Sequence, residues 1–285
     1  MRTWDTVAII GVGLVGGSVG MALRQRGVAR HVIGVGRSAS RLNKARQRGA
    51  VTSATTSVAR GVAAAELILV CTPPQRIVAQ VRAATAHCPP GALITDVGST
   101  KQRIVAELER QWTAAAERGV AFVGSHPLAG GEGSGVEHAR ADLLDGRTVV
   151  VTPSRRTRRA AREAIESFWG SLGAHVLRMS PREHDRAVAA VSHLPHIVAS
   201  ALASATSMRD RHLAASGWLD TTRIAAGNPE LWRQILLDNR RHVLQSVGKF
   251  AKVLSEFCEA LITQDGPRLV QLLAAGRRRR GAVGN

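Results

Sequence analysis

The chain has 285 residues, of which 45% are hydrophobic and 21% are charged. This length and composition predict one large or two modest globular domains that need no disulfide bonds or other cross-links to be stable. Its three cysteines, Cys71, Cys88 and Cys258, are odd in number and widely spaced, which excludes a disulfide framework or a zinc cage. We therefore expect a protein of the reducing cytoplasm.

The charge balance of 39 Lys and Arg against 21 Asp and Glu gives a net charge of +18, which would suit nucleic acid, anionic small molecules or merely an arginine-rich proteome. The densest basic runs are RRTRRAAR (155–162) and RRRR (277–280). Aromatic residues make up 3% of the chain and do not interleave with these runs, so stacking on bases is disfavoured. We expect a solvated helix face, a disordered tail over 271–285, and no nucleic-acid partner.

Residues 6–23, TVAIIGVGLVGGSVGMAL, form the first notable stretch because they carry no charge. Its five glycines are Gly11, Gly13, Gly16, Gly17 and Gly20. Each would cost a helix about 1 kcal/mol relative to Ala, and the run barely reaches the ~20 residues that a membrane span needs. Arg26 and Arg30 follow directly, without the cleavage site of a signal peptide. The stretch therefore predicts a buried strand, a tight turn and a helix, and no membrane span.

The turn in this stretch has the pattern GxGxxG, followed by a helix that Gly27 can end. The first glycine permits the turn, the second lets backbone amides approach a pyrophosphate, and the third lets helix and strand pack closely. We predict a dinucleotide cofactor. Its contacts would be Gly11, Gly13, Leu14, Val15 and Gly16.

The second predicted strand, 31–36, ends in Gly36-Arg37-Ser38 rather than in the acidic residue that binds the ribose hydroxyls of NAD. A guanidinium and a hydroxyl can bind a 2′-phosphate, so Arg37 and Ser38 favour NADP over NAD. The alternative is that Arg37 stacks on adenine or faces water.

Further strands are predicted at 65–74, 91–101, 120–131, 147–153 and 175–179, with a helix at 161–173 before the last. This spacing indicates a doubly wound α/β sheet, in which ligands gather beyond the carboxyl ends of the strands. Polar groups at those ends are Thr72, Ser99, Lys101 and His126. The turn Cys71-Thr72-Pro73 would lie over the cofactor.

A second domain is predicted from Ser180, giving domains 1–179 and 180–285. Ser180, Pro181 and Glu183 have the pattern of a capping box, and no strand pattern follows. Asn228 would cap a very long helix reaching about Thr263. Its apolar stripe is Val243, Val247, Phe250, Leu254, Phe257 and Leu261. Because a small helical domain offers such a helix few internal partners, we expect a homodimer.

The first helix of this domain contains VSHLPHIVAS (191–200), where Pro195 should kink the helix. Ser192 and His196 share a face and His193 lies one step round, a pattern that favours a site lining over an ordinary core histidine. Asp220 and Arg223 follow in a glycine-flanked segment, where a surface salt bridge is the alternative.

With GVGLVGGS, VCTP, ITDVGSTK, GSHPLAGGEGSG, VSHLPHIVAS and SGWLDTTRIAAGNPELW in this order, the chain resembles the prephenate and arogenate (cyclohexadienyl) dehydrogenases of tyrosine biosynthesis over about residues 6–262. The resemblance implies a Rossmann domain joined to an all-helical dimerisation domain, with the active site between them. It implies oxidative decarboxylation: hydride leaves C4 of the substrate for the nicotinamide, the ring carboxylate leaves as CO₂, and the ring becomes aromatic.

The same resemblance implies roles for particular residues. His126 would hydrogen-bond the C4 hydroxyl while neutral, and Ser99 would help to orient His126 or that hydroxyl. Substrate contacts would come from Ser192, His193, His196, Asp220, Arg223 and Trp232. Of these, Arg223 would bind a substrate carboxylate, Asp220 would steady that region, and Trp232 would pack near the pocket.

Several alternatives stay open. The choice between prephenate and arogenate is not decided, and we expect neither a fused mutase nor a regulatory domain. The β-hydroxyacid dehydrogenases and imine reductases have a similar architecture but use a helical lysine, for which only Lys249 and Lys252 are available. A regulator that binds NADP and DNA without turnover would have no need of His126 together with the SHLPH helix.

Overall fold

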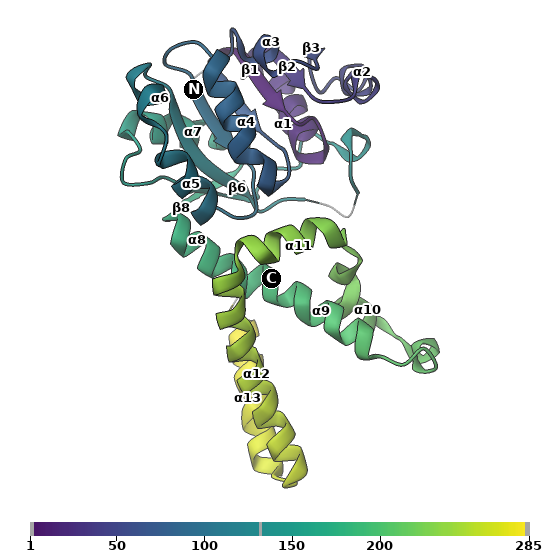
Figure 1. Cartoon of the computed structure of the whole chain (residues 1–285). Coiled ribbons are helices and arrows are strands. Elements are labelled where there is room, and N and C mark those ends of the chain that lie inside the picture. Colours follow the sequence, from purple (N-terminus) through teal and green to yellow (C-terminus); the bar gives the residue numbers. More distant parts are fainter. Residues whose placement is uncertain (1–2, 131–132, 283–285) are drawn as a thin grey trace.

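The computed structural model describes residues 3–130 and 133–282. Its first part is built on one eight-stranded sheet with the strand order β3-β2-β1-β4-β5-β6-β7-β8 (Figure 1). The strands are β1 (Trp4–Ile10), β2 (Ala29–Val35), β3 (Ser53–Thr55), β4 (Leu67–Val70), β5 (Leu93–Asp96), β6 (Ala121–Pro127), β7 (Thr148–Thr152) and β8 (His175–Arg178). All neighbouring strands are parallel except β6 and β7. The predicted doubly wound α/β fold is confirmed, with β3 as an additional short edge strand.

Helices cover both faces of this sheet. They are α1 (Leu14–Gln25), α2 (Ala39–Gln47), α3 (Val58–Val62), α4 (Pro74–His87), α5 (Gln102–Glu109), α6 (Thr113–Glu117), η1 (Val136–His138) and α7 (Arg159–Ser171). One core packs α1 and α7 against the sheet, and the other packs α3, α4, α5 and α6 on the opposite face. The central strand β4 is apolar and buried along its whole length because both faces of the sheet are covered.

Every element described after β8 is helical. They are α8 (Pro181–Val188), η2 (Ala189–His193), α9 (Leu194–Ala205), η3 (Asp210–Leu213), α10 (Ser216–Thr222), η4 (Arg223–Ala226), α11 (Pro229–Asp238), α12 (Arg240–Ile262) and α13 (Gly266–Gly281). The predicted capping box is present, with Glu183 N donating to Ser180 Oγ and Ser180 N donating to Glu183 Oε2. Figure 1 shows α8 leading away from the sheet and α12 with α13 extending as a pair from the other helices.

The very long helix expected from Asn228 to about Thr263 is wrong, because the structure divides it into α11 and α12 at Asn239. The backbone there leaves the helical region, with φ −104° and ψ 20°. The amide of Asn239 is buried and donates to the carbonyl oxygen of Asp185 at 2.6 Å. A tertiary hydrogen bond thus replaces helix continuity at this residue, which periodicity alone does not reveal.

The disordered tail expected over 271–285 is also wrong for residues 271–281, which continue helix α13. Asp265 caps this helix by accepting from Arg268 N at 2.9 Å, and Arg268 also pairs with Glu256 of α12 at 2.9 Å. These contacts hold α13 against α12, and the arginine run at 277–280 forms its exposed last turns. Residues 283–285 lie outside the described residues.

The two parts meet at the amino end of α5. The carboxylate of Asp185 accepts from the backbone N–H of Lys101 at 2.8 Å and of Gln102 at 2.9 Å. Asp238 accepts from Arg103 at 3.0 Å. Because a helix amino end carries unsatisfied donors and partial positive charge, two acidic residues of the helical part stabilise the junction there.

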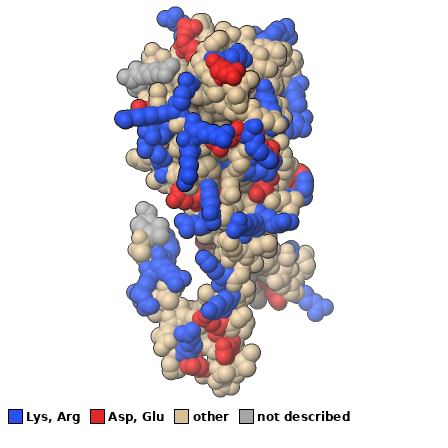
Figure 2. Space-filling view, turned by 60° about the vertical axis from the view of Figure 1, so that its left-hand side comes forward, with Lys and Arg blue, Asp and Glu red and all other residues tan. Residues whose placement is uncertain are grey.

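Basic side chains are spread over both parts of the molecule, with acidic ones among them (Figure 2). In the run at 155–162, Arg158 donates to the carbonyl oxygen of Gly119, and Arg159 pairs with Glu163 at 2.6 Å. These contacts are those of a helix face on the surface of the sheet domain, as expected for this run.

Within the described residues, one helical run, Pro181–Ala205, is long and apolar enough by length and composition to cross a membrane. The same run supplies Asp185 to the junction with α5 and buries His184 and His193. Part of this run therefore lies at the contact between the two parts of the molecule, and 28% of its most apolar window is buried.

Candidate active site

The turn between β1 and α1 has the geometry that a dinucleotide requires. Gly11 has a φ of +98°, and a Cβ there would lie 2.6 Å from the carbonyl oxygen of Cys71. A Cβ on Gly16 would lie 2.2 Å from the carbonyl oxygen of Gly11, whereas one on Gly13 would meet nothing within 4 Å. The first and third glycines of the pattern are thus required by close packing, and the second faces open space.

Two further features of this turn fit a pyrophosphate. Helix α1 begins at Leu14, followed by Val15, and has no side-chain cap. The N–H groups of its first turn therefore have no side-chain acceptor. The hydroxyl oxygen of Thr72, beyond the end of β4, is buried and has no hydrogen-bond partner among the described residues. Cys71, Thr72 and Pro73 lie in the turn before α4, where Thr72 Cγ2 comes within 3.2 Å of a Cβ built on Gly11. These residues could hold a nicotinamide dinucleotide.

At the carboxyl end of β2, Arg37 is exposed, and Ser38 caps α2 by accepting from Arg41 N at 3.4 Å. Ser38 Oγ also lies 2.9 Å from Ser40 Oγ. Both residues therefore lie at the sheet edge where the adenosine ribose is bound in this fold, and the guanidinium of Arg37 forms no ion pair with a described residue.

A buried charged cluster anchors the ends of β5 and β6. Lys101 and Asp96 form an ion pair in which both side chains are fully buried. Lys101 Nζ also donates to the carbonyl oxygen of Ser125 at 2.9 Å, and Asp96 accepts from Ser125 N at 3.1 Å. Burial lowers the pKa of Lys101, against the attraction of Asp96 and Asp185. The cluster fixes the backbone that carries His126.

His126 lies in β6 and points toward the helical part. Its Nδ1 lies 2.8 Å from His184 Nε2, and the two rings meet edge to face with centroids 5.1 Å apart. His184 is fully buried, and its Nδ1 lies 2.7 Å from Asp185 Oδ1. Two groups of α8 thus support a histidine of the sheet domain.

The surroundings of His126 favour a neutral ring. Burial lowers its pKa well below the ordinary value, and the proximity of His184, Lys101 and His193 adds to this effect. His126 as a whole residue is half-buried, so part of its surface is open to a ligand. A neutral imidazole can accept a hydrogen bond, which is the property expected for this residue.

Ser99 lies in the turn between β5 and α5, next to the buried cluster. Ser99 and His126 come from adjacent strand ends, and no hydrogen bond joins them within the described part of the chain. Ser99 remains a candidate for contact with a bound ligand.

Where a kink was expected at Pro195, the structure has a five-residue π-helical turn, η2, which ends two residues before the proline. This turn carries Ser192, which is half-buried, and His193, which is 1% exposed. Asn239 Nδ2 lies 3.2 Å from His193 Nδ1, which places the ring proton of His193 on Nε2. Burial lowers the pKa of His193 to about 4. His193 is thus a second neutral imidazole at the junction.

His196 stacks on Trp232 of α11, with ring centroids 3.6 Å apart and planes 10° from parallel. Its Nδ1 is buried without a hydrogen-bond partner among the described residues, and burial lowers its pKa. Gly227 is required beside this pair, because a Cβ there would lie 2.5 Å from the Trp232 indole nitrogen. Three of the predicted substrate residues, His193, His196 and Trp232, are therefore together.

Asp220 and Arg223 lie on α10 and η4, and both are exposed in the single chain. Element η4 packs on α9, so Arg223 belongs to the same group of helices as the His196–Trp232 pair. No contact between Arg223 and His126 occurs among the described hydrogen bonds. The meeting of these two side chains across one cleft therefore stays a prediction. Gly131 and Glu132, part of the GSHPLAGGEGSG motif, lie outside the described residues.

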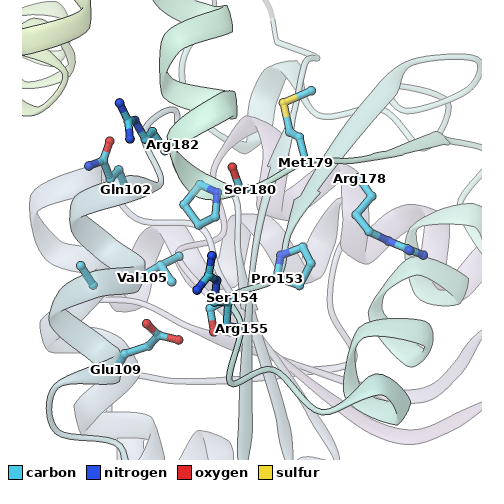
Figure 3. A pocket seen from close by; sticks show the side chains of 12 residues that line it. Gln102, Val105, Glu109, Pro153, Ser154, Arg155, Arg178, Met179, Ser180 and Arg182 are labelled. Carbon is cyan, nitrogen blue, oxygen red and sulfur yellow. The ribbon is translucent and has the colours of Figure 1, made fainter.

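A cavity of about 520 Å³ opens at the junction but on another side, between α5, the end of β7 and the start of α8. Figure 3 shows Arg155, Arg178 and Arg182 around it, with Pro153 and Val105 on its apolar walls. It includes none of the predicted site residues, so it is separate from the candidate active site.

Residues missed by the sequence analysis are Asp96, His184, Asp185 and Asn239. Asp96 stands in ITDVGSTK and His184 with Asp185 in SPREHD, where they were considered only as parts of a turn and a cap. Their signal was polarity within stretches that had to be buried. Their long-range partners lie 29 to 84 positions away in the sequence, so the pairings depend on tertiary structure.

A doubly wound sheet with a dinucleotide turn, and a neutral histidine at the end of β6 that faces a helical second part, are typical of a dehydrogenase that uses a nicotinamide dinucleotide. The comparisons make this specific. The family model "Prephenate dehydrogenase, nucleotide-binding domain" matches residues 19–178, and "Prephenate dehydrogenase, dimerization domain" matches residues 180–275.

Among curated proteins, the chain is 32% identical over 272 residues to the prephenate dehydrogenase of Bacillus subtilis, covering 93% of this chain and 72% of that protein. Among solved structures it is similar to prephenate dehydrogenase from Aquifex aeolicus, in complex with hydroxyphenyl propionate and NAD⁺, with a TM-score of 0.88, 30% identity and 98% of each chain covered. It is also similar to Synechocystis arogenate dehydrogenase, with a TM-score of 0.81, 32% identity and coverage of 97% of this chain and 99% of that one. The chain belongs to the prephenate dehydrogenase family, whose members are oxidoreductases of tyrosine biosynthesis.

Proposed function

We propose that this protein oxidatively decarboxylates prephenate, arogenate or both, with hydride transfer to a nicotinamide dinucleotide. The observation that carries the proposal is the neutral His126, held at the end of β6 between the dinucleotide turn and the helical part. When bound, the oxidised nicotinamide supplies the hydride acceptor. The residues of the chain must then hold the ring and manage its hydroxyl proton.

His126 would accept the hydrogen bond of the C4 hydroxyl, and Ser99 would orient that hydroxyl from the neighbouring strand end. Ser192, His193, His196 and Trp232 would line the ring and side chain of the substrate. Arg223 would bind a substrate carboxylate through its planar guanidinium, with Asp220 steadying that segment. Lys249 and Lys252 are exposed on α12, away from this group, which disfavours the lysine-dependent alternative.

The experiment that tests this function crosses prephenate or arogenate with NAD⁺ or NADP⁺ in four assays of the purified protein. Reduced cofactor is followed by absorbance, and the aromatic product is identified. We expect formation of 4-hydroxyphenylpyruvate or tyrosine in at least one assay. No turnover in all four would overturn the proposal.

For the cofactor we propose a preference for NADP, on the basis of the exposed Arg37 and the absence of an acidic residue at the end of β2. Gly36→Asp should repel the 2′-phosphate and move the ratio of kcat/KM values for NADP⁺ over NAD⁺ toward NAD⁺ by about tenfold or more. Gly36→Ala is the matched control, since a Cβ there meets only the side chain of Leu42, at 3.2 Å. If G36D leaves the ratio unchanged, this account of the pocket is wrong.

We further propose a cytoplasmic homodimer formed through the helical domain. The three cysteines are free, which suits a reducing compartment. Large apolar side chains on the helical part are exposed in the single chain, including Leu254 at 52% and Ile262 at 82%. An apolar surface of this kind is typical of a subunit interface.

A further inference from the structure

The geometry points to a proton relay, Asp185–His184–His126, in which two residues of α8 set the tautomer and basicity of the histidine on β6. This inference deepens the proposed function and depends on it for its chemical step. His184 and Asp185 are positioning residues here, because they act through His126 rather than on the substrate.

The relay begins at the carboxylate of Asp185, which can only accept hydrogen bonds when ionised. Its Oδ1 accepts from Lys101 N at 2.8 Å, and its Oδ2 accepts from Gln102 N at 2.9 Å. Oδ1 also lies 2.7 Å from His184 Nδ1. The two backbone donors keep the carboxylate in place at the positive end of α5, so His184 must carry a proton on Nδ1 to face it.

A neutral His184 with its proton on Nδ1 has a lone pair on Nε2. That nitrogen lies 2.8 Å from His126 Nδ1 and is fully buried, so it can find no acceptor or donor in solvent. His126 Nδ1 therefore donates to it. This leaves the lone pair of His126 on Nε2, the nitrogen that points away from α8.

This tautomer is the one the reaction needs. As hydride leaves C4, the C4 hydroxyl proton passes to His126 Nε2 and the C4–O bond becomes a carbonyl. His126 Nδ1–H can move toward His184 Nε2, where the carboxylate of Asp185 offsets the positive charge. The bond between the ring and its carboxylate carbon then breaks and releases CO₂. Its electron pair moves into the ring, which becomes aromatic, and the C4 oxygen takes the proton back to form a phenol. Substrate and oxidised cofactor thus give phenol, CO₂ and reduced cofactor.

Among residues 3–130 and 133–282, the titratable groups that lower the pKa of His126 belong to this arrangement or adjoin it. They are His184 from α8, His193 from η2 and Lys101 from the start of α5. Of the acidic groups near the relay in the described residues, Asp96 pairs with Lys101, and Asp185 contacts His184. Asp185 also joins α8 to α5, so the relay is complete only when the two domains are docked.

The first test measures the tautomer directly in the resting protein. Ring ¹⁵N shifts are recorded on protein labelled at histidine, with His126→Asn used to assign the signals. We expect His126 to carry its proton on Nδ1, with an unprotonated Nε2. A proton on Nε2 of His126 would overturn the relay, whether or not the protein turns over either substrate.

The second test compares His184→Gln with His184→Leu under saturating cofactor. Gln can still accept from His126 Nδ1–H but cannot take up its proton, whereas Leu removes the acceptor altogether. We expect kcat to fall in the order wild type, H184Q, H184L, by roughly 10- to 100-fold for H184L, with KM within about twofold.

The matched control is His175→Gln on the exposed edge strand β8, which should retain the kcat of the wild type. If H184L does not fold, H184Q and the ¹⁵N measurement still decide the question. An active wild type with unchanged kcat in H184Q and H184L would overturn the relay alone. An inactive wild type would instead overturn the proposed function and leave the tautomer result standing.

Discussion

At the scale of single residues, the surroundings of His126 all shift its pKa in the same direction. Burial and three basic neighbours lower its pKa, so the ring stays neutral at pH values where a solvent-exposed histidine would already be protonated. A group with this property can accept a proton across the whole physiological pH range.

His126→Asn should lower kcat by ~10²- to 10⁴-fold with little change in KM, because Asn cannot take up a proton. Steady-state kinetics on the best of the four substrate and cofactor pairs measures this. His87→Asn, at the exposed end of α4, serves as the control. A near-normal kcat in H126N would remove His126 from the mechanism.

The pH dependence follows from the same surroundings. Since the pKa of His126 is lowered, its neutral form persists below pH 6.5, and the acid limb of kcat/KM due to this ring should lie below that value. This limb should be absent from H126N. An acid limb centred at or above pH 6.5 that disappears in H126N would contradict the effect of burial.

Arg223 should act on binding rather than on the chemical step. Arg223→Ala removes a charged hydrogen-bond donor to a substrate carboxylate, so we expect KM to rise about 10- to 100-fold with a smaller effect on kcat. Arg211→Ala on the exposed η3 is the control. An unchanged KM for R223A would place the carboxylate-binding group elsewhere.

At the scale of elements, the ends of β5 and β6 depend on the buried pair of Lys101 and Asp96. Lys101→Met would leave Asp96 charged, buried and without its cation, which should lower the free energy of unfolding by about 3–5 kcal/mol. Chemical denaturation followed by tryptophan fluorescence measures this change. Lys44→Met removes one partner of the exposed Lys44–Glu137 pair and should cost less than about 1 kcal/mol.

A loss for K101M no larger than that for K44M would show that the buried pair does not stabilise the strand ends. Activity should fall with stability in K101M, because the same cluster holds the backbone of Ser125 next to His126.

The elements also show how far the sequence could be interpreted. Strands such as β1 and β4 were predictable because a continuous apolar run bounded by turns has few other solutions. The glycine turn was predictable because its steric requirements are local, as the close approach of Gly16 to Gly11 confirms. The break at Asn239 and the pairing of His184 with His126 were not, since each depends on a partner 46 or more positions away.

Helix α13 illustrates a wrong prediction that was made from composition. A run of four arginines suggested a disordered segment, but helix propensity of Arg is high and a capped start at Asp265 lets α13 form against α12. Composition alone did not reveal that a neighbouring helix was available.

At the scale of the whole molecule, the helical part leaves apolar side chains of α12 and α13 uncovered in the single chain, including Leu261 at 62% and Val270 at 66% exposure. We expect a particle of twice the 30.3 kDa chain mass by light scattering. Leu254→Glu combined with Leu261→Glu should shift it to a monomer, because charges would then be buried in the interface.

The control for this shift is Leu177→Glu on β8, whose side chain is 47% exposed on the sheet domain. It should leave the dimer intact. A dimer that persists in the double variant would place the subunit contact on another surface, and a wild-type monomer would contradict the homodimer altogether.

The π-helical turn η2 determines how the segment from α8 to η2 can contact both the sheet domain and the helices α11 and α12. Residues nine positions apart on a regular α-helix lie on opposite sides, since each residue advances about 100°. A π turn accommodates one extra residue, so it takes away about 100° of that rotation between His184 and His193. His184 can then face His126 of the sheet domain while His193 faces Asn239, at the break between α11 and α12, so one helical segment contacts both neighbours.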